Sequence, residues 1–306
     1  MPVPSRSSNF GDLLDPRMKD VFNDAYAQLP DRIGTFYDVV GPGPTTADIR
    51  YSEVGAFGDV PEFTGSVTYD DVSQGYDVTI TPKEYASGFQ VERKLYDDDL
   101  TGIIEQKPRG LGTAYQRTRQ KHAASLFVNS FSLDATWLSH TEGVALCSDS
   151  HTTTSGASTA AGFDNLSTAS LNAVTVSASR TSMRGFRGDR AERISVMPDL
   201  LVVPIDREDD ANEIVKSQGK PDTATNNMNV NYGRFRVESW EYLTDANDFW
   251  MIDSAMMKQF VKWFERTGSE FAMVENLDTI LAKWRLYCRY GLGWIGWRWV
   301  LGHQVS

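Results

Sequence analysis

The chain has 306 residues, of which 41% are hydrophobic and 23% are charged, a composition that excludes a fibre or a wholly disordered protein. Its net charge of -11 argues against tight, general binding to nucleic acid, because phosphates repel an acidic surface. No apolar run approaches the roughly 18 residues of a membrane span, so no membrane partner is expected. The two cysteines, Cys147 and Cys288, favour a reducing compartment over a disulfide scaffold, with a single bridge between them as the alternative.

The N-terminal region predicts an arm that carries one short helix. Residues 1–14 are rich in Pro and Ser and are expected to be flexible. From Asp15, an N-cap residue, apolar side chains that include Phe22 and Tyr26 recur at helical spacing until Pro30. A helix of this length is not stable alone, so its apolar side must dock on the body of the protein or on another copy.

Residues 33–93 lose the helical period and become rich in Thr, Val, Tyr, Phe and Gly. Segments 48–57, 65–71 and 75–81 have strand-like composition and are separated by turn signals, which predicts an extended β-hairpin region. This region has too few apolar residues to bury a core of its own. We therefore expect it to be held by contacts with something else.

Residues 97–131 predict a long, one-faced helix, which is the central element of the chain. Asp97, Asp98 and Asp99 can cap its start, and an interruption is expected at 108–112. The face opposite the apolar stripe is basic and carries no acid after Glu105. That face consists of Lys107, Arg109, Arg117, Arg119 and Lys121. We expect salt bridges to an acidic neighbouring surface, with phosphate contact as the alternative.

The second half of the chain predicts a small α/β or α+β unit followed by strands. Residues 139–165 are expected to form a surface loop because Ser, Thr, Gly and Ala dominate. The run 199–204 is apolar and bounded by Pro198 and Pro204, as in a fully buried strand. The remaining predicted elements are helices at 167–184 and 206–217 and strands at 233–243, 248–253, 280–290 and 294–301.

Motifs that could carry chemistry lack the context that they need. The glycine string 291–296 has no helix after it, so dinucleotide binding is not predicted. Metal-ligand types gather in the segment 140–151, at His140, Glu142, Cys147, Asp149 and His151, but their spacing fits no zinc pattern. Clustered tryptophans could stack on a sugar, although core packing is favoured; they are Trp284, Trp294, Trp297 and Trp299. No catalytic, metal-binding or cofactor-binding residue is assigned.

Six segments, in this order, resemble one known family. They are Phe89–Arg93, Asp97–Ile104, Cys147–His151, Pro198–Pro204, Asp248–Asp253 and Arg289–Trp294. Together they are similar to the tailed-bacteriophage major capsid proteins of the HK97 fold, in particular the Mu-like major head subunits. The departures from that family are a Trp-rich C-terminus and a thinly apolar arm.

The resemblance implies an α+β, HK97-like capsid fold. Its parts would be an N-terminal arm (1–47), an extended loop (48–93), a peripheral domain with a spine helix (94–140), an axial domain (141–235) and C-terminal strands that complete both domains (236–306). The extended loop would lie over a neighbouring subunit.

The implied function is that of a major head protein, not an enzyme. Its copies would assemble through hexamers and pentamers, in the host cytoplasm, into an icosahedral shell around double-stranded DNA that they contact weakly. Further partners would be a portal and scaffold or decoration proteins. Carbohydrate binding at the tryptophans and metal-dependent hydrolysis at 140–151 are the alternatives. The residues expected to contact other subunits are Arg109, Arg117, Arg119, Lys121, Phe57, Phe63, Tyr69, Tyr76, Phe22 and Tyr26.

Overall fold

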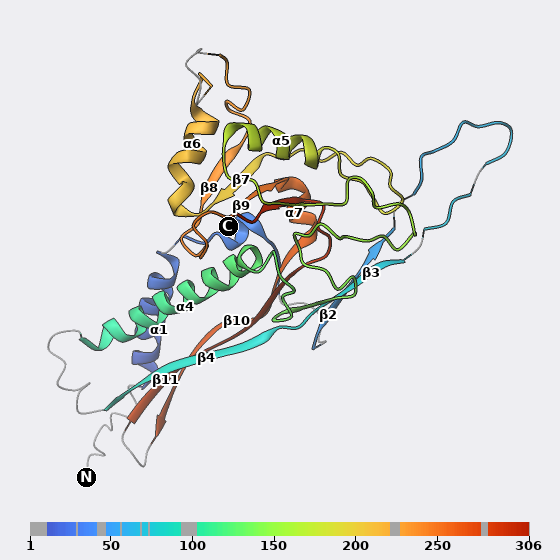
Figure 1. The fold of residues 1–306 in the computed structure, drawn as a ribbon. Helices are drawn as coiled ribbons and strands as arrows, with labels where there is room; N and C mark the ends of the chain where they lie inside the picture. Colours follow the sequence, from blue (N-terminus) through green and yellow to red (C-terminus); the bar gives the residue numbers. More distant parts are fainter. Residues whose placement is uncertain are drawn as a thin grey trace, which may run out of the picture.

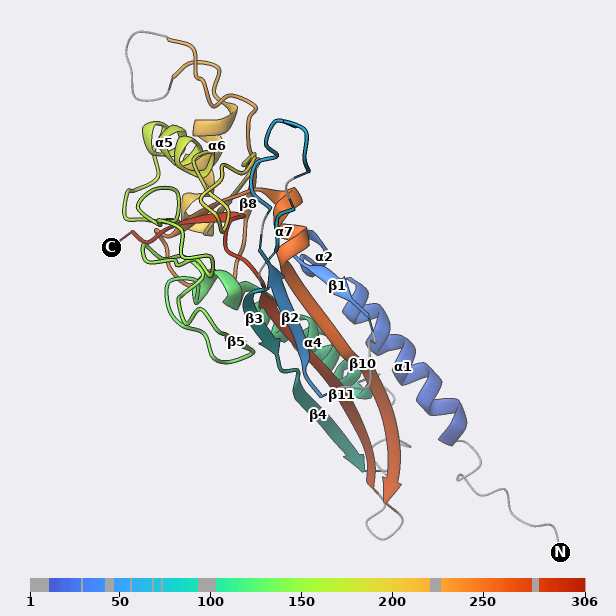
Figure 2. The same cartoon turned by 90° about the vertical axis from the view of Figure 1, so that its right-hand side faces the viewer.

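A computed structural model describes residues 11–28, 30–41, 47–55, 57–67, 69–72, 74–92, 103–220, 227–276 and 281–305 (Figure 1). The predicted cap at Asp97–Asp99 lies outside these residues. The molecule is elongated: helices α5 and α6 lie at one end, and a long sheet extends away from them with helix α1 alongside (Figure 2). No helix in the described ranges has the length and apolarity needed to cross a membrane.

The long sheet has the strand order β1-β10-β11-β4, and its strands are β1 (Asp38–Val40), β10 (Val261–Asn276), β11 (Leu281–Trp294) and β4 (Lys83–Glu92). Side chains of a strand alternate between the two faces of its sheet. In β11, Trp284, Leu286 and Cys288 are buried, whereas Lys283 and Arg285 are exposed. One face therefore packs inward and the other carries charge.

Two helices cover the inward face of this sheet: α1 (Gly11–Ala27) and α4 (Ile103–Val128). They cross closely at Gly112, where an added Cβ would lie 2.8 Å from the carbonyl oxygen of Phe22. The predicted interruption at 108–112 is wrong, because α4 continues through Pro108. Pro108 removes one backbone donor near the start of the described helix, and the packed turns that follow hold the helix together.

The second sheet has the order β6-β12-β9-β7-β8 and lies at the end of the molecule that carries α5 and α6 (Figure 1). Its strands are β6 (Leu166–Ser167), β12 (Val300–His303), β9 (Phe249–Ile252), β7 (Leu200–Val203) and β8 (Arg236–Ser239), and the helices are α5 (Ala173–Met183) and α6 (Glu208–Lys216). Every residue of β7, β9 and β12 is buried. This confirms the buried strand predicted at 199–204.

The third sheet has the order β2-β3-β5 and carries the hairpin. Its strands are β2 (Ile49–Val54), β3 (Gln74–Ile80) and β5 (Leu138–His140), and all of its pairs are antiparallel. The strand predicted at 65–71 is wrong: the described residues between 55 and 72 form no strand, and they make the long tip that projects from the body in Figure 1.

Short elements connect the sheets. These are α2 (Ile33–Phe36), the 3-10 turn η2 (Ile205–Arg207) and α7 (Ser254–Phe260). Asp253 caps α7, since its carboxylate accepts from the backbone N–H groups of Ala255 and Met256. The helix predicted at 167–184 is shorter than expected because its N-cap is Asn172, whose side chain accepts from the backbone N–H of Thr175.

Candidate assembly surfaces

Together with Val54 at the end of β2, which is counted with it from here on, the hairpin tip leaves six large apolar side chains uncovered. Their exposed fractions are 75% for Val54, 65% for Phe57, 94% for Val60, 70% for Phe63, 63% for Val67 and 91% for Tyr69. Contiguous exposed apolar surface on a folded protein typically marks a site of association. The structure thus places Phe57, Phe63 and Tyr69 where a second molecule can reach them.

Ionic and polar contacts hold the base of this tip against the body. The guanidinium of Arg190 lies 2.5 Å from the carboxylate of Asp70, and the same carboxylate accepts from the backbone N–H of Gly58. The neighbouring cation and these hydrogen bonds hold the pKa of Asp70 below its ordinary value. The tip therefore leaves the body in a defined direction.

Tyr76 does not belong to this exposed set. Its ring is half-buried, and its hydroxyl lies 2.5 Å from the hydroxyl of Thr152 in the loop after β5. The structure gives Tyr76 a contact within the chain, and its expected contact with another subunit stays a prediction. Since β3 pairs directly with β5, a side chain on this part of the hairpin reaches its own subunit first.

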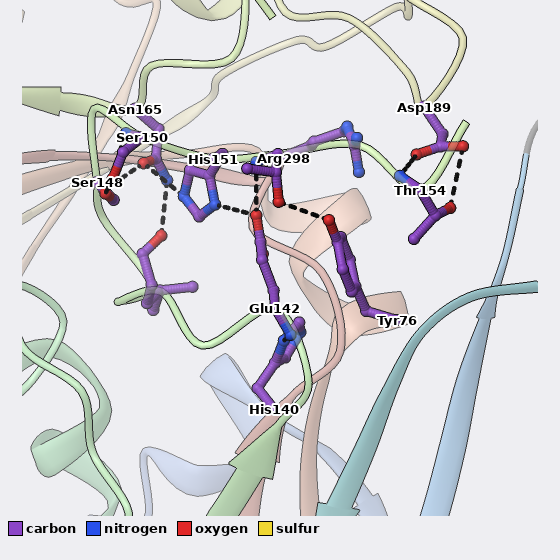
Figure 3. A network of polar contacts seen from close by, with 12 residues as sticks. Tyr76, His140, Glu142, Ser148, Ser150, His151, Thr154, Asn165, Asp189 and Arg298 are labelled. Carbon is purple, nitrogen blue, oxygen red and sulfur yellow. Dashed lines mark hydrogen bonds and ion pairs between the residues drawn. The ribbon is translucent and has the colours of Figure 1, made fainter. Parts of the chain in front are cut away.

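Behind Tyr76 lies a buried polar network (Figure 3). Glu142 accepts from Nδ1 of His151 at 3.0 Å and from the backbone N–H of Thr152 at 2.9 Å. Burial is the largest single influence and raises the pKa of Glu142, but the hydrogen bonds from His151 and Thr152 and the attraction to His151 together outweigh it, so the pKa is lowered. The side chains of Glu142 and His151 are 1% and 0% exposed, so this pair fixes the loop from inside.

Asn165 sets the orientation of His151. Its amide nitrogen donates to the carbonyls of Leu146 and Val300, and its Oδ1 accepts from the backbone N–H of Ser148 at 2.7 Å. Oδ1 also lies 3.1 Å from Nε2 of His151. The loop after β5 is thereby tied to the C-terminal segment.

Arg298 ties strand β2 to the same region. Its guanidinium pairs with Glu53 at 3.2 Å and donates to the carbonyl oxygen of Arg187. Burial raises the pKa of Glu53 even though Arg298 lies beside it. Three distant parts of the sequence are joined here, and together they form a rigid base for the exposed tip.

The basic face of α4 is split by burial. Arg109, Arg117 and Lys121 are exposed and fall on one row of the helix, in which Thr113 takes the fourth place. Within the described ranges these three cations make no ion pair. They remain candidates for contact with another subunit.

Arg119 requires a correction. It is 6% exposed, and its guanidinium lies 5.5 to 5.7 Å from the rings of Tyr26, Tyr115 and Trp263. It also pairs with Glu265 on β10 at 3.8 Å. Arg119 is two residues from Arg117, so helical geometry turns it towards the sheet rather than the surface. Its partners belong to its own subunit.

The expectation for Phe22 and Tyr26 is corrected for the same reason. Phe22 is 1% exposed and stacks on Phe271 of β10 with the ring centroids 5.0 Å apart. Tyr26 is half-buried and its hydroxyl accepts from Arg119. Of the two docking modes left open by the sequence, this structure has α1 docked on the body of its own chain.

Neither alternative function gains support from the geometry. The indole rings of Trp284, Trp294, Trp297 and Trp299 are at most 5% exposed, so they offer no platform to a sugar. His140, Glu142 and His151 do come together, but Cys147 is buried elsewhere and Asp149 is exposed. The described residues contain no group of three or more His, Cys, Asp or Glu side chains placed to hold a metal ion.

Sequence reasoning missed the aliphatic part of the tip. Val54, Val60 and Val67 are as exposed as the aromatic residues but were not singled out. A signal was present: Val54, Phe57, Val60 and Phe63 recur at every third position, which is neither a helical nor a strand period. Such spacing aligns side chains along one side of an extended, polyproline-like segment.

A spine helix on one sheet, a second buried sheet and an uncovered projecting hairpin are the features of a shell subunit. The fold matches solved capsids. The capsid of bacteriophage JBD30 aligns with a TM-score of 0.54 at 19% identity, covering 73% of this chain and 94% of that one. The mature capsid of bacteriophage PhiM1 aligns at 0.59 and 10% identity, covering 91% and 88%. The capsid of the native GTA particle aligns at 0.56 and 13%, covering 91% of each.

The family follows from the sequence itself. Residues 75–301 match the family model described as phage capsid protein, so the chain belongs to this family. A search of curated proteins found no significant relative. The chain is a major capsid protein of the HK97-like fold, and its copies form the shell of a virion capsid. The resemblance inferred from the six sequence segments is confirmed.

Proposed function

We propose that copies of this chain assemble through hexamers and pentamers into an icosahedral shell that encloses double-stranded DNA. The observation that carries this proposal is the projecting tip, whose six large apolar side chains have no cover in a single copy. Burying a surface of this kind against a partner is favourable in water. Since the family builds shells from identical subunits, the partner is another copy.

Each part of the fold is proposed to have its own role in the shell. Residues 48–93 act as the extended loop that lies over a neighbour, and α4 with the long sheet forms the peripheral domain. Residues 141–235, with β9 and β12, form the axial domain. Many modest interfaces of this kind sum to a stable closed lattice while each remains reversible.

Charge gives the shell two further properties. The net charge of -11 keeps packaged DNA from adhering to the wall, so contact with DNA is weak and non-specific. The exposed row of Arg109, Arg117 and Lys121 is proposed to pair with an acidic surface of a neighbouring subunit. The protein performs no catalysis, assembles in the host cytoplasm, and works with a portal and with scaffold or decoration proteins.

Electron microscopy of the purified protein tests the proposal, and closed particles are expected. The double variant Arg117→Glu with Lys121→Glu should lose most particles while the subunit keeps its fold by circular dichroism, because both side chains are exposed. The charge-preserving pair Arg117→Lys with Lys121→Arg is the matched control and should assemble. Normal particles from the charge-reversed variant would show that this basic row does not contribute to an interface between subunits.

A further inference from the structure

A cavity of about 290 Å³ opens between the C-terminal end of α4, the segment 132–146 and the last residues of β11. Its walls are mainly apolar and include five side chains that are at most 5% exposed, those of Leu126, Trp137, Leu146, Leu292 and Trp294. An apolar cavity of about 150 Å³ admits a benzene molecule. This cavity has nearly twice that volume, so it has room for a body of two fused aromatic rings.

Asp134 places a negative charge on the wall of this cavity. Its side chain is half-buried, and both carboxylate oxygens accept hydrogen bonds: Oδ1 from the backbone N–H of Thr136 at 2.8 Å, and Oδ2 from the amide of Asn129 at 2.9 Å. Neither donor carries a charge, and Asp134 pairs with no cation among the residues that the structure describes. An ionised carboxylate has about four acceptor positions, so about two remain for a ligand.

The other ionisable side chain on the wall, His140, is neutral. Its Nδ1 accepts from the backbone N–H of Glu142 at 3.2 Å, and its Nε2 donates to the carbonyl oxygen of Ile295 at 3.1 Å. An imidazolium has no acceptor nitrogen, so this arrangement belongs to the neutral ring. Burial also lowers the pKa of His140. Of the described residues that line the cavity, Asp134 alone is charged at neutral pH.

The charge of Asp134 also acts on the interior. Burial is the main cause that raises the pKa of Tyr37, and the nearby carboxylate of Asp134 raises it further. The ammonium group of Lys83 lies 5.5 Å from the ring centre of Trp137, but Lys83 is exposed and does not line the cavity. The cavity is therefore an apolar space beside a negative charge that no described cation neutralises.

We propose that this cavity binds a small arylalkyl amine, with the aromatic body among the apolar walls and the ammonium group on the carboxylate of Asp134. The walls favour an aromatic body because they bury apolar surface, and the carboxylate favours an ammonium group because a charge-assisted hydrogen bond is the stronger kind. A neutral molecule of the same shape would leave Asp134 without a cation, and an anion would be repelled. The site does not depend on self-assembly, since one copy of the chain supplies all of its walls.

Titration calorimetry of the full-length protein at neutral pH tests the site with three probes that share one bicyclic body. Tryptamine carries a cation, 3-ethylindole is neutral and indole-3-propionate carries an anion. Tryptamine should bind at least about tenfold more tightly than 3-ethylindole, because only its ammonium group pairs with the carboxylate, and indole-3-propionate should bind most weakly. Absence of tryptamine binding at millimolar concentration, or equal affinities for tryptamine and 3-ethylindole, would overturn the proposal.

Asp134→Asn removes the charge and keeps the shape of the side chain. The affinity for tryptamine should fall about tenfold, to the level of 3-ethylindole, whose own affinity should stay as in the parent and so show that the cavity is intact. Asp209→Asn, at an exposed acid of α6, is the matched control and should bind tryptamine as the parent does. If Asp134→Asn keeps the parent affinity for tryptamine, the ammonium group is not bound at this carboxylate.

A substitution at the mouth of the cavity gives an independent readout. Leu133 lines the cavity and is 66% exposed, so Leu133→Lys should fold as the parent does and bring a competing cation next to Asp134. Its affinity for tryptamine should fall several-fold. Val174→Lys, at a position on α5 that is 68% exposed, is the control and should leave tryptamine binding unchanged. Equal affinities in these two variants would contradict binding beside Leu133 and Asp134.

Discussion

The crossing of α1 and α4 at Gly112 gives the sharpest test of how the N-terminal helix is held. An added Cβ at Gly112 would lie 2.8 Å from the Phe22 carbonyl oxygen and 3.4 Å from the Ala25 Cβ. The first distance is too short for a real contact and involves backbone, so α1 must move. At Gly110, one half-turn earlier, an added Cβ meets nothing within 4 Å. The two glycines are therefore a matched pair.

The expected changes in the free energy of unfolding follow from two opposing effects. Replacing Gly by Ala inside a helix stabilises it by about 1 kcal/mol, and both variants receive this gain. Gly112→Ala also overpacks the crossing, which costs about 1–3 kcal/mol. Gly110→Ala should thus raise the free energy of unfolding, and Gly112→Ala should fall about 1–3 kcal/mol below it.

Urea unfolding of unassembled subunits measures this difference, and limited proteolysis of α1 locates it. Faster cleavage within Gly11–Ala27 is expected for Gly112→Ala alone, because a displaced α1 loses the stacking of Phe22 on Phe271. If the two variants are stabilised equally, α1 does not cross α4 at this distance in solution, and its docking on the same subunit would have to be abandoned.

Three further predictions address pH, the hairpin and the aromatic cage of Arg119. Burial lowers the pKa of His303 to about 4, so its contribution to stability is present above pH 6.5 and falls as pH drops towards 4. This contribution should be about 2 kcal/mol smaller at pH 5 than at pH 8, and His303→Gln should weaken the pH dependence of the free energy of unfolding by that amount. Replacing residues 57–72 by a short turn should leave the subunit folded by circular dichroism but abolish particles in electron microscopy. Arg119→Met leaves Glu265 without its cation and should lower the urea midpoint by an amount equivalent to about 1–3 kcal/mol.

Two strands of the second sheet, β7 and β9, are predicted well because they are short apolar runs with clear borders. The strand predicted at 294–301 is wrong, since residues 295–299 form bends and turns and β12 spans Val300–His303. Leu200–Val203 lies between two prolines, and Phe249–Ile252 lies between two acids. Every side chain in these runs is buried, so neither packing nor partner choice alters the pattern. The local apolar pattern and the buried position of these residues favour the same element, so the sequence alone predicts it.

The sequence pattern did not predict α7 or β10. For β10, the register of its pairing with β11 explains why. Strand β10 has irregularities between Glu265 and Thr267 and between Thr267 and Glu270, where its pairing with β11 shifts. Each shift moves later side chains to the other face, so a strict period of two is lost over the strand. The segment 261–276 therefore shows no alternation from which a strand of this length could be predicted.

The strand prediction in the hairpin tip is wrong for a different reason, and this reason bears on function. Residues 65–71 have strand composition, yet no described strand pairs with them, and their polar contacts with the rest of the described chain involve only Asp70 and Asp71. Val67 and Tyr69 remain 63% and 91% exposed. Strand propensity depends on what packs on both faces, and a segment without neighbours remains extended but unpaired. The wrong strand prediction and the exposed apolar side chains of the tip therefore have the same cause: no other described segment of the chain packs on these side chains.

Arg119 is a residue whose burial the sequence did not predict. Its residue type predicts a solvated cation. The helical period places it on the side of the helix away from the row that holds Arg109 and Lys121, but no local feature of the sequence shows what its guanidinium contacts there. What distinguishes it is the arrival of Tyr26 from α1 and of Trp263 and Glu265 from β10, elements far away in the chain. A buried guanidinium needs such partners to offset its lost hydration. The cage can therefore exist only once α1 is docked, which makes Arg119 a link between the N-terminal helix and the sheet rather than a contact between subunits.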